Sequence, residues 1–179
     1  SRPTTTPTLP PALTPPPTLI PATPLPDRSK ATTYSSDALG FRFDYPSFWN
    51  LQTDPEEPVD ILLTSFDPAS PPHKQEWDEN TVRISFREVP AEEAPETLAE
   101  YLQEWGGHAD AAGLTIIGEE EFLIGKGLSA AHLVLVSGSG GKFEFVYFIL
   151  APHHIEVGVE GNFVLAKRVL DTVRSCGPC

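Results

Sequence analysis

The sequence predicts an α+β fold, a three-layer α/β/α sandwich in which a mainly antiparallel sheet of six or seven strands carries a helix on each face. Two windows, residues 95–105 and 162–173, repeat apolar side chains at i, i+3, i+4 and i+7, which is typical of amphipathic helices. Three strand patterns follow one another between residues 128 and 159 with short turns, so we expect antiparallel pairing. The segment 143–150 is apolar almost throughout, which indicates a sheet covered on both faces.

The composition changes sharply near Asp27. Residues 1–26 contain ten of the chain's 20 prolines and seven threonines, but one charged residue and no glycine or aromatic residue. Because proline fixes φ and lacks an amide donor, this segment is predicted to be a disordered stalk that stays extended and solvated. Residues 27–179 are predicted to form one α/β domain, since a chain of that length can bury an adequate core.

The charge of the domain excludes several classes of partner. Residues 27–179 carry 25 acidic and 11 basic side chains, a formal charge of −14, which repels phosphate backbones and anionic lipid surfaces. We therefore expect no nucleic acid as a partner, and membrane association only through an upstream anchor. No motif implies a cofactor, and an acidic run such as residues 119–121 is typical of a solvated face.

The first strand pair is predicted over residues 34–45, where Phe41 and Phe43 alternate with polar residues. Pro46 ends the second strand because proline cannot continue the hydrogen-bonded ladder. Trp49 follows as a large apolar side chain, which we expect to fill one end of the core.

Six further strands are predicted from apolar or alternating segments, most of them bounded by Gly, Pro or Asp. They span residues 59–66, 81–88, 114–123, 128–137, 142–151 and 154–159. The first helix is expected to begin near Pro95 and to end at Gly106-Gly107. Asn162 is expected to cap the second helix, which should continue to Val173.

The strand that leads to Trp49 carries a resemblance to a known family. Residues 40–49, GFRFDYPSFW, resemble the opening of PsbP-like, Mog1-like and related bacterial surface lipoprotein domains, in which an aromatic strand runs into Tyr-Pro and a Trp. The order of elements is similar over residues 34–175, with one helix before the meander and one after it. The resemblance implies a non-catalytic binding or assembly module that acts through a protein partner, and it supplies no catalytic residue to carry over.

The stalk also suggests where the protein works. The chain contains no Met and begins at Ser1, so we expect an exported, extracytoplasmic monomer held off a membrane, for example by an acylated residue upstream. The alternatives are a linker between two domains of a longer chain and a plain disordered tail.

The terminal Cys176-Gly-Pro-Cys179 has the spacing of a thioredoxin-type dithiol, but it follows a helix instead of starting one, so no amide cluster lowers the pKa of the first thiol. A small terminal disulfide or two loose thiols are the favoured interpretations. His154, Cys176 and Cys179 are weak candidates for a metal site, because a zinc deaminase combines His-x-Glu with Pro-Cys-x-x-Cys. The match fails in detail, since Ser175 stands where that motif has Pro.

The segment 67–79 lacks periodicity and is predicted to be a surface loop, the kind of element that often binds partners. Within it Trp77 and His73, and His153 beyond it, are the predicted partner or ligand contacts. Trp77 folded back over the sheet edge is the equally weighted alternative. A small-ligand or glycan-binding domain remains open as a second function, and a metal-dependent hydrolase with a pocket of converging His, Asp or Glu as a third.

Overall fold

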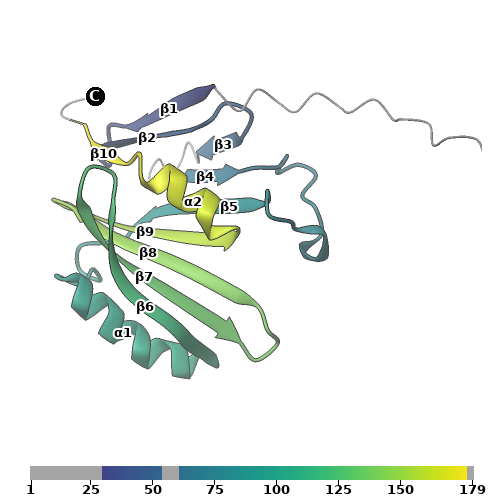
Figure 1. Ribbon diagram of the computed structural model, residues 1–179. Helices are drawn as coiled ribbons and strands as arrows, with labels where there is room; N and C mark the ends of the chain where they lie inside the picture. Colours follow the sequence, from purple (N-terminus) through teal and green to yellow (C-terminus); the bar gives the residue numbers. More distant parts are fainter. Residues whose placement is uncertain (1–29, 54–60, 177–179) are drawn as a thin grey trace, which may run out of the picture.

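The computed structural model describes residues 30–53 and 61–176 (Figure 1). The predicted stalk and the predicted boundary near Asp27 lie outside these residues and stay predictions. Among the described helices, none is long and apolar enough to cross a bilayer.

The main sheet has seven strands, each antiparallel to its neighbours, in the order β3-β4-β5-β9-β8-β7-β6. The predicted mainly antiparallel α+β fold is thus confirmed. The last four strands of this sheet form a meander. Its turns lie at residues 125–127 and 138–141, as the sequence predicts, and at residues 151–152, one residue before the predicted Pro152-His153. The strands are β3 (Asn50–Thr53), β4 (Ile61–Thr64), β5 (Val82–Glu88), β6 (Leu114–Ile124), β7 (Leu128–Ser137), β8 (Lys142–Leu150) and β9 (His153–Gly161).

A second, three-stranded sheet was not expected as a separate unit. It has the order β1-β2-β10 and consists of β1 (Ala31–Ser36), β2 (Phe41–Pro46) and β10 (Arg174–Ser175). The sequence predicted the β1–β2 hairpin but neither β10 nor β3. Both missed strands are short, and β10 has no apolar alternation that could identify it.

Both helices form where the apolar periodicity placed them, with corrected ends. Helix α1 (Leu98–Ala111) begins after Thr97, whose side chain accepts a hydrogen bond from the Glu100 amide. It continues through Gly106-Gly107, contrary to the prediction, and ends where Gly113 takes a positive φ of 69°. Helix α2 (Phe163–Leu170) starts at the predicted cap Asn162, which accepts from the Val164 amide, but is shorter than predicted.

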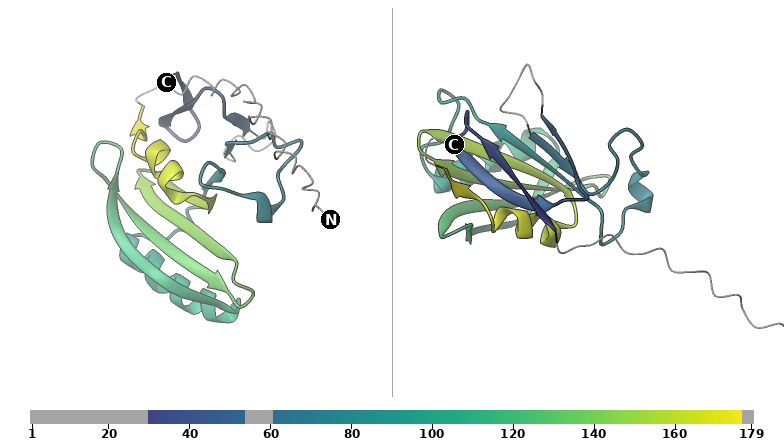
Figure 2. Two further views of the ribbon diagram at one scale, coloured as in Figure 1. Left: turned by 45° about the vertical axis from the view of Figure 1, so that its right-hand side comes forward. Right: turned by 90° about the horizontal axis from the view of Figure 1, so that it is seen from above.

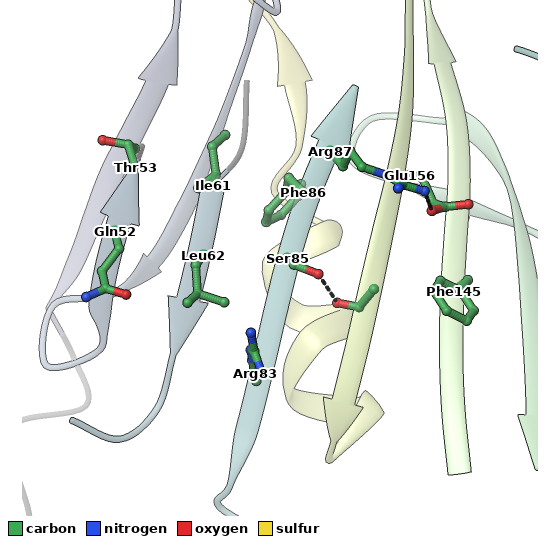
Figure 3. Close-up of a pocket in the computed structure, with 11 residues that line it drawn as sticks. Gln52, Thr53, Ile61, Leu62, Arg83, Ser85, Phe86, Arg87, Phe145 and Glu156 are labelled. Carbon is green, nitrogen blue, oxygen red and sulfur yellow. Dashed lines mark hydrogen bonds and ion pairs between the residues drawn. The ribbon is translucent and has the colours of Figure 1, made fainter. Parts of the chain in front are cut away.

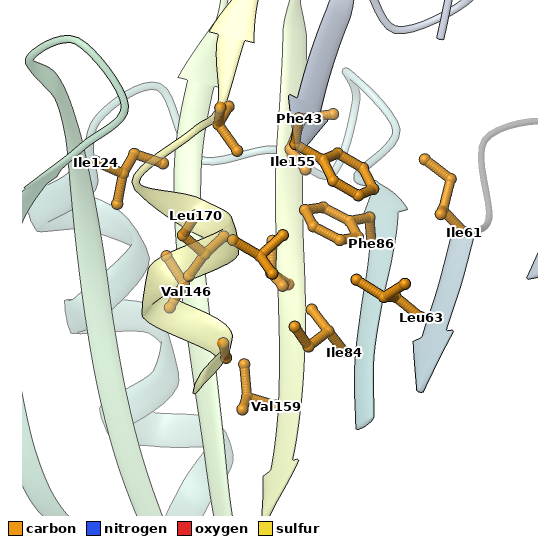
Figure 4. Close-up of a cluster of buried hydrophobic side chains, with 14 of the residues drawn as sticks. Phe43, Ile61, Leu63, Ile84, Phe86, Ile124, Val146, Ile155, Val159 and Leu170 are labelled. Atoms are coloured by element: carbon orange, nitrogen blue, oxygen red, sulfur yellow. The ribbon is translucent and has the colours of Figure 1, made fainter. Parts of the chain in front are cut away.

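The two helices pack on opposite faces of the main sheet, as predicted (Figure 2). Helix α2 packs on β2, β5 and β9, while α1 packs on β6, β7 and β8. The small sheet shares the α2 side. Its Phe43 ring stacks on Phe86 of β5 at 4.8 Å (Figure 4). Trp49 is 8% exposed within the same core, as the sequence predicted.

A charged cluster is buried near the start of α2. The His132 ring lies parallel to Phe163 at 4.0 Å, and its two nitrogens contact Glu120 at 3.0 Å and Glu144 at 2.9 Å. Burial alone would lower the pKa of His132, but the hydrogen bonds to Glu144 and Glu120 outweigh it and raise that pKa above its ordinary value. Burial likewise opposes ionisation of Glu144, yet hydrogen bonds from His132 and Lys142 hold the pKa of this carboxyl below its usual range.

Candidate functional site

Within residues 30–53 and 61–176, no helix covers one half of the main sheet on the face that α1 covers in the other half. Along β5 the side chains alternate: Val82, Ile84 and Phe86 are buried on the α2 side, whereas Arg83, Ser85 and Arg87 are exposed. The exposed set faces the side on which α1 lies. The structure thus leaves a polar sheet surface open beside a helix.

This surface is hollowed into a cleft of about 710 Å³, called the sheet cleft below (Figure 3). Its centre is one cross-strand row that runs from β3 to β8 through successive paired positions. The row is Gln52, Leu62, Ser85, Gly158 and Phe145. The other lining residues are Thr53, Ile61, Arg83, Phe86, Arg87 and Glu156.

Gly158 has no side chain, so the floor of the sheet cleft is formed by backbone at this position. A Cβ at this position would lie 2.8 Å from the Ser85 hydroxyl oxygen, closer than real Cβ contacts. The Ser85 hydroxyl donates to the Gly158 carbonyl at 3.4 Å (Figure 3). Backbone is therefore accessible where the neighbouring strands present side chains.

Two arginines stand on the β5 side of the sheet cleft. Arg83 contacts Glu160 at 3.4 Å through one nitrogen, and Lys74 contacts the same carboxylate at 2.8 Å. Arg87 pairs with Glu156. The side chains of Arg83 and Arg87 are 48% and 63% exposed, so about half or more of each is accessible to solvent.

Two buried tyrosines stack beneath α1, next to Glu156 of the sheet cleft. The Tyr101 ring lies parallel to Tyr147 at 4.3 Å, and its hydroxyl donates to Glu156 at 3.0 Å. Burial, with the Glu156 carboxylate nearby, raises the pKa of Tyr101 far above its ordinary value. Burial raises the pKa of Tyr147 to about 12. Both hydroxyls stay protonated at neutral pH, so Glu156 keeps a hydrogen-bond donor from α1.

The sheet cleft offers hydrogen-bonding and apolar groups from its side chains and from the backbone. Its described lining holds one carboxylate, Glu156, and no histidine or cysteine. Both Glu156 oxygens are already bonded, one to Arg87 and the other to Tyr101. Glu156 is therefore held in place by groups from β5 and α1.

The three predicted contact residues lie apart from the sheet cleft. Trp77 is half-buried, contacts the Phe66 ring at 5.6 Å and donates from its indole nitrogen to the Pro72 carbonyl at 3.2 Å. Its indole therefore packs against the Phe66 ring and bonds within its own loop. His73 is exposed, and the His153 ring contacts Glu88 at 2.6 Å.

The weak metal candidates do not form a site among the described residues, where no group of three His, Cys, Asp or Glu side chains is arranged to hold an ion. His154 contacts the Tyr147 hydroxyl at 2.7 Å through Nδ1. Cys176 is disulfide-bonded, and its amide donates to the Gly40 carbonyl at 2.9 Å. Cys179 lies outside the described residues.

Comparisons with known proteins identify the fold. No protein-family model matches the sequence, and no curated protein matches it. The solution structure of cyanobacterial PsbP (CyanoP) from Synechocystis sp. PCC 6803 is similar, with a TM-score of 0.52 and 14% identity over 81% of this chain and 92% of that chain. A protein of unknown function from Pseudomonas aeruginosa, PA94, has a TM-score of 0.41 and 14% identity over 77% and 87% of the two chains. The PsbP/Mog1-like fold expected from residues 40–49 is confirmed.

Proposed function

We propose that this domain is a non-catalytic binding module that docks a protein segment carrying acidic side chains in the sheet cleft. The observation that carries the proposal is the uncovered half-face of the sheet, with its two exposed arginines in a chain of net charge −13. A purely solvated face of such an acidic protein would be expected to carry mostly acids.

The width of the sheet cleft supports a protein segment as its occupant. Its lining comes from five adjacent strands, β3, β4, β5, β9 and β8. At about 4.8 Å between strands, this row spans roughly 19 Å. That width suits a peptide segment lying across the strands, with apolar contacts to Leu62 and Phe145 and access to the Gly158 backbone.

Charge complementarity supports acidic side chains on that segment. Each arginine contacts its glutamate through one nitrogen, which leaves the other donors of its planar fork for a ligand. Arginine binds carboxylates in paired hydrogen bonds. An incoming carboxylate can therefore bind Arg83 or Arg87 without displacing Glu160 or Glu156.

We also propose that the domain works outside the cytoplasm on a flexible tether. The Pro/Thr-rich composition of residues 1–26 suits an extended spacer. The disulfide at Cys176 suits an oxidising compartment, because thiols are kept reduced in the cytosol of most organisms. Cell fractionation tests this: the chain should accompany the envelope or the medium, and recovery in the cytosol would contradict it.

Site-specific cross-linking tests the docking surface. The full chain, with benzoylphenylalanine at Ser85 or at Ser35, is irradiated in an extract of its own organism. Ser35 is the matched control, an exposed serine on a strand of the small sheet. We expect one protein adduct from position 85 and none from position 35, mapped by mass spectrometry to a segment with Asp or Glu.

Further variants, made in the chain without the photoreactive residue, test whether such an adduct reports docking. Ser85→Phe places a large ring on the floor of the sheet cleft and should abolish co-purification of the partner, whereas the control Ser35→Phe should not. Arg83→Gln with Arg87→Gln should weaken capture about tenfold or more, because two charge-assisted contacts are lost. A partner retained by the Ser85→Phe variant, or labelled equally from both positions, would overturn the proposal.

A further inference from the structure

A second hollow lies on the opposite side of the main sheet from the sheet cleft, between the end of β2 and helix α2. We call it the aromatic groove, and it encloses about 290 Å³. Its apolar walls are Tyr45, Phe48 and Trp49 on one side and Leu165 and Val169 of α2 on the other. Pockets of about this size, lined by aromatic and aliphatic side chains, hold small organic molecules.

Helix periodicity explains why one cation enters an apolar wall. Leu165, Arg168 and Val169 stand at i, i+3 and i+4 on α2, so they share one side of the helix. Lys30 lines the groove from the start of β1. The aromatic groove therefore combines an apolar interior with a cation from each of two elements.

The other charged group in the groove is already neutralised. Asp44 accepts hydrogen bonds from Arg174 at 2.9 and 3.0 Å and from the Thr33 hydroxyl at 2.6 Å. The Arg174 guanidinium, with help from Thr33, holds the pKa of the Asp44 carboxyl below its usual range. Thr172 is satisfied too, since its hydroxyl donates to Val169 and accepts from the Asp44 amide. The net charge offered to a ligand is that of Lys30 and Arg168.

Most of the described lysines and arginines form ion pairs, and the ones that do not are distributed unevenly. Of the chain's 12 lysines and arginines, Arg2 and Arg28 fall outside the described residues, which leaves ten. Six of those ten form ion pairs with Asp or Glu. The four without an ion pair among the described residues are Lys30, Arg42, Lys126 and Arg168. Two of these four line the same groove.

We propose that the aromatic groove binds a small amphiphilic carboxylate, a molecule with one apolar ring or short branched chain and one carboxylate group. The apolar body lies between Trp49 and Leu165, where it loses contact with water. The carboxylate takes paired hydrogen bonds from Arg168 and a charge contact from Lys30. The groove volume limits the ligand to a compact molecule, and the acidic surroundings select against ligands of high negative charge.

This site is separate from the proposed docking surface. None of its lining residues lines the sheet cleft. A ligand here can therefore bind whether or not the sheet cleft holds a protein, and failure of one proposal leaves the other standing.

Titration of the full chain with 3-phenylpropionate tests the proposal, followed through the three tryptophan indole N–H signals in ¹H–¹⁵N NMR spectra. We expect saturable movement of the Trp49 signal, identified by its loss in Trp49→Phe. The neutral analogue 3-phenylpropanol should bind about tenfold or more weakly, because it forms no charge-assisted contact.

Charge variants with matched controls complete the test. Lys30→Gln and Arg168→Gln should each weaken 3-phenylpropionate binding about tenfold, while Lys126→Gln and Arg42→Gln, which also remove cations without ion pairs, should leave it unchanged. These positions are exposed, so the variants should keep the wild-type unfolding midpoint. Equal affinity for acid and alcohol, equal loss in the control variants, or no saturation below about 10 mM would overturn the proposal.

Discussion

On the face of the main sheet that carries α1, side chains alternate between the two sides of the sheet in both halves. In one half the side chains on this face are buried, and in the other they are exposed. Under α1, β7 and β8 present Leu133, Leu135 and Tyr147, all fully buried. Across β5 the equivalent side of the sheet presents Arg83 and Ser85, both exposed. The register between β8, β9 and β5 is continuous, so the change is not a break in the sheet.

The comparison shows that one face of the sheet is packed beneath a helix in one half and exposed in the other. A helix of 14 residues is about 21 Å long and about 10 Å wide, so it cannot cover the face of seven strands. The strands beyond α1 carry polar side chains that tolerate water. Stability and partner binding should therefore respond to different substitutions.

The largest effect is expected from a matched pair of leucine truncations, one in each half. Leu133→Ala removes a fully buried side chain beneath α1 and should lower the free energy of unfolding by about 2–5 kcal/mol, because it leaves a cavity. Leu62→Ala, in the half-buried floor of the sheet cleft, should cost about 1 kcal/mol or less. Urea unfolding of the two variants measures the difference.

An equal loss of unfolding free energy in the two leucine variants would contradict the expected difference between the two halves of the sheet. It would mean that the surface around Leu62 is as tightly packed as the region beneath α1. The sheet cleft would then be part of the core, and its proposed role in docking would be wrong.

The exposed ion pairs of the sheet cleft contrast with a buried cluster on the opposite face of the sheet, which α2 covers, and pH tests the difference. His132 is 6% exposed there, stacks on Phe163 of α2 and bonds two carboxylates. Its raised pKa means that the folded state binds its proton more tightly than the unfolded state does. The stability due to protonated His132 is fully present below the ordinary value of 6.5 and is lost as pH rises through the raised value.

His132→Gln should therefore cost about 1–3 kcal/mol near pH 6 and less near pH 9, because the imidazolium contributes at the lower pH. Glu144, whose pKa is lowered, adds stability above its ordinary value of 4.5 that is lost at lower pH. Urea unfolding at several pH values measures this, with His108→Gln as the control at an exposed histidine of α1. A penalty independent of pH would show that the cluster acts by packing alone.

Much of the architecture could be predicted because local pattern and tertiary packing agree. The apolar run 143–150 is a central strand, Asn162 caps α2, and Trp49 fills the core. The predicted end of α1 was wrong, because tertiary packing outweighs the low helix propensity of glycine there. Gly106-Gly107 stays helical because apolar neighbours such as Trp105 and Ala109 pack on β7 and β8, and this stabilises the last turns of α1.

The candidate site could not be predicted because it depends on strand order. Arg83, Ser85 and Arg87 alternate in one strand, which the sequence shows only as a solvated face. Their neighbours Glu156 and Gly158 come from β9, about 70 residues later, and only the pairing of β5 with β9 joins them. The alternating Arg-x-Ser-x-Arg in an acidic chain is the signal that could have drawn attention to this strand. Trp77 was the predicted contact instead, because aromatic side chains in loops commonly bind partners or ligands.

The smallest effect on stability is expected where the effect on function should be largest. Arg83→Gln removes a 3.4 Å contact with Glu160 that is exposed and shared with Lys74, so the free energy of unfolding should change by about 0.5 kcal/mol or less. Arg87→Gln should cost more, because it leaves the buried Glu156 with Tyr101 alone. If Arg83→Gln weakens partner capture while its urea midpoint stays at the wild-type value, Arg83 is placed for recognition. If it lowers stability and capture together, the uncovered half of the sheet supports the fold in the same way as the covered half, and the distinction between them fails.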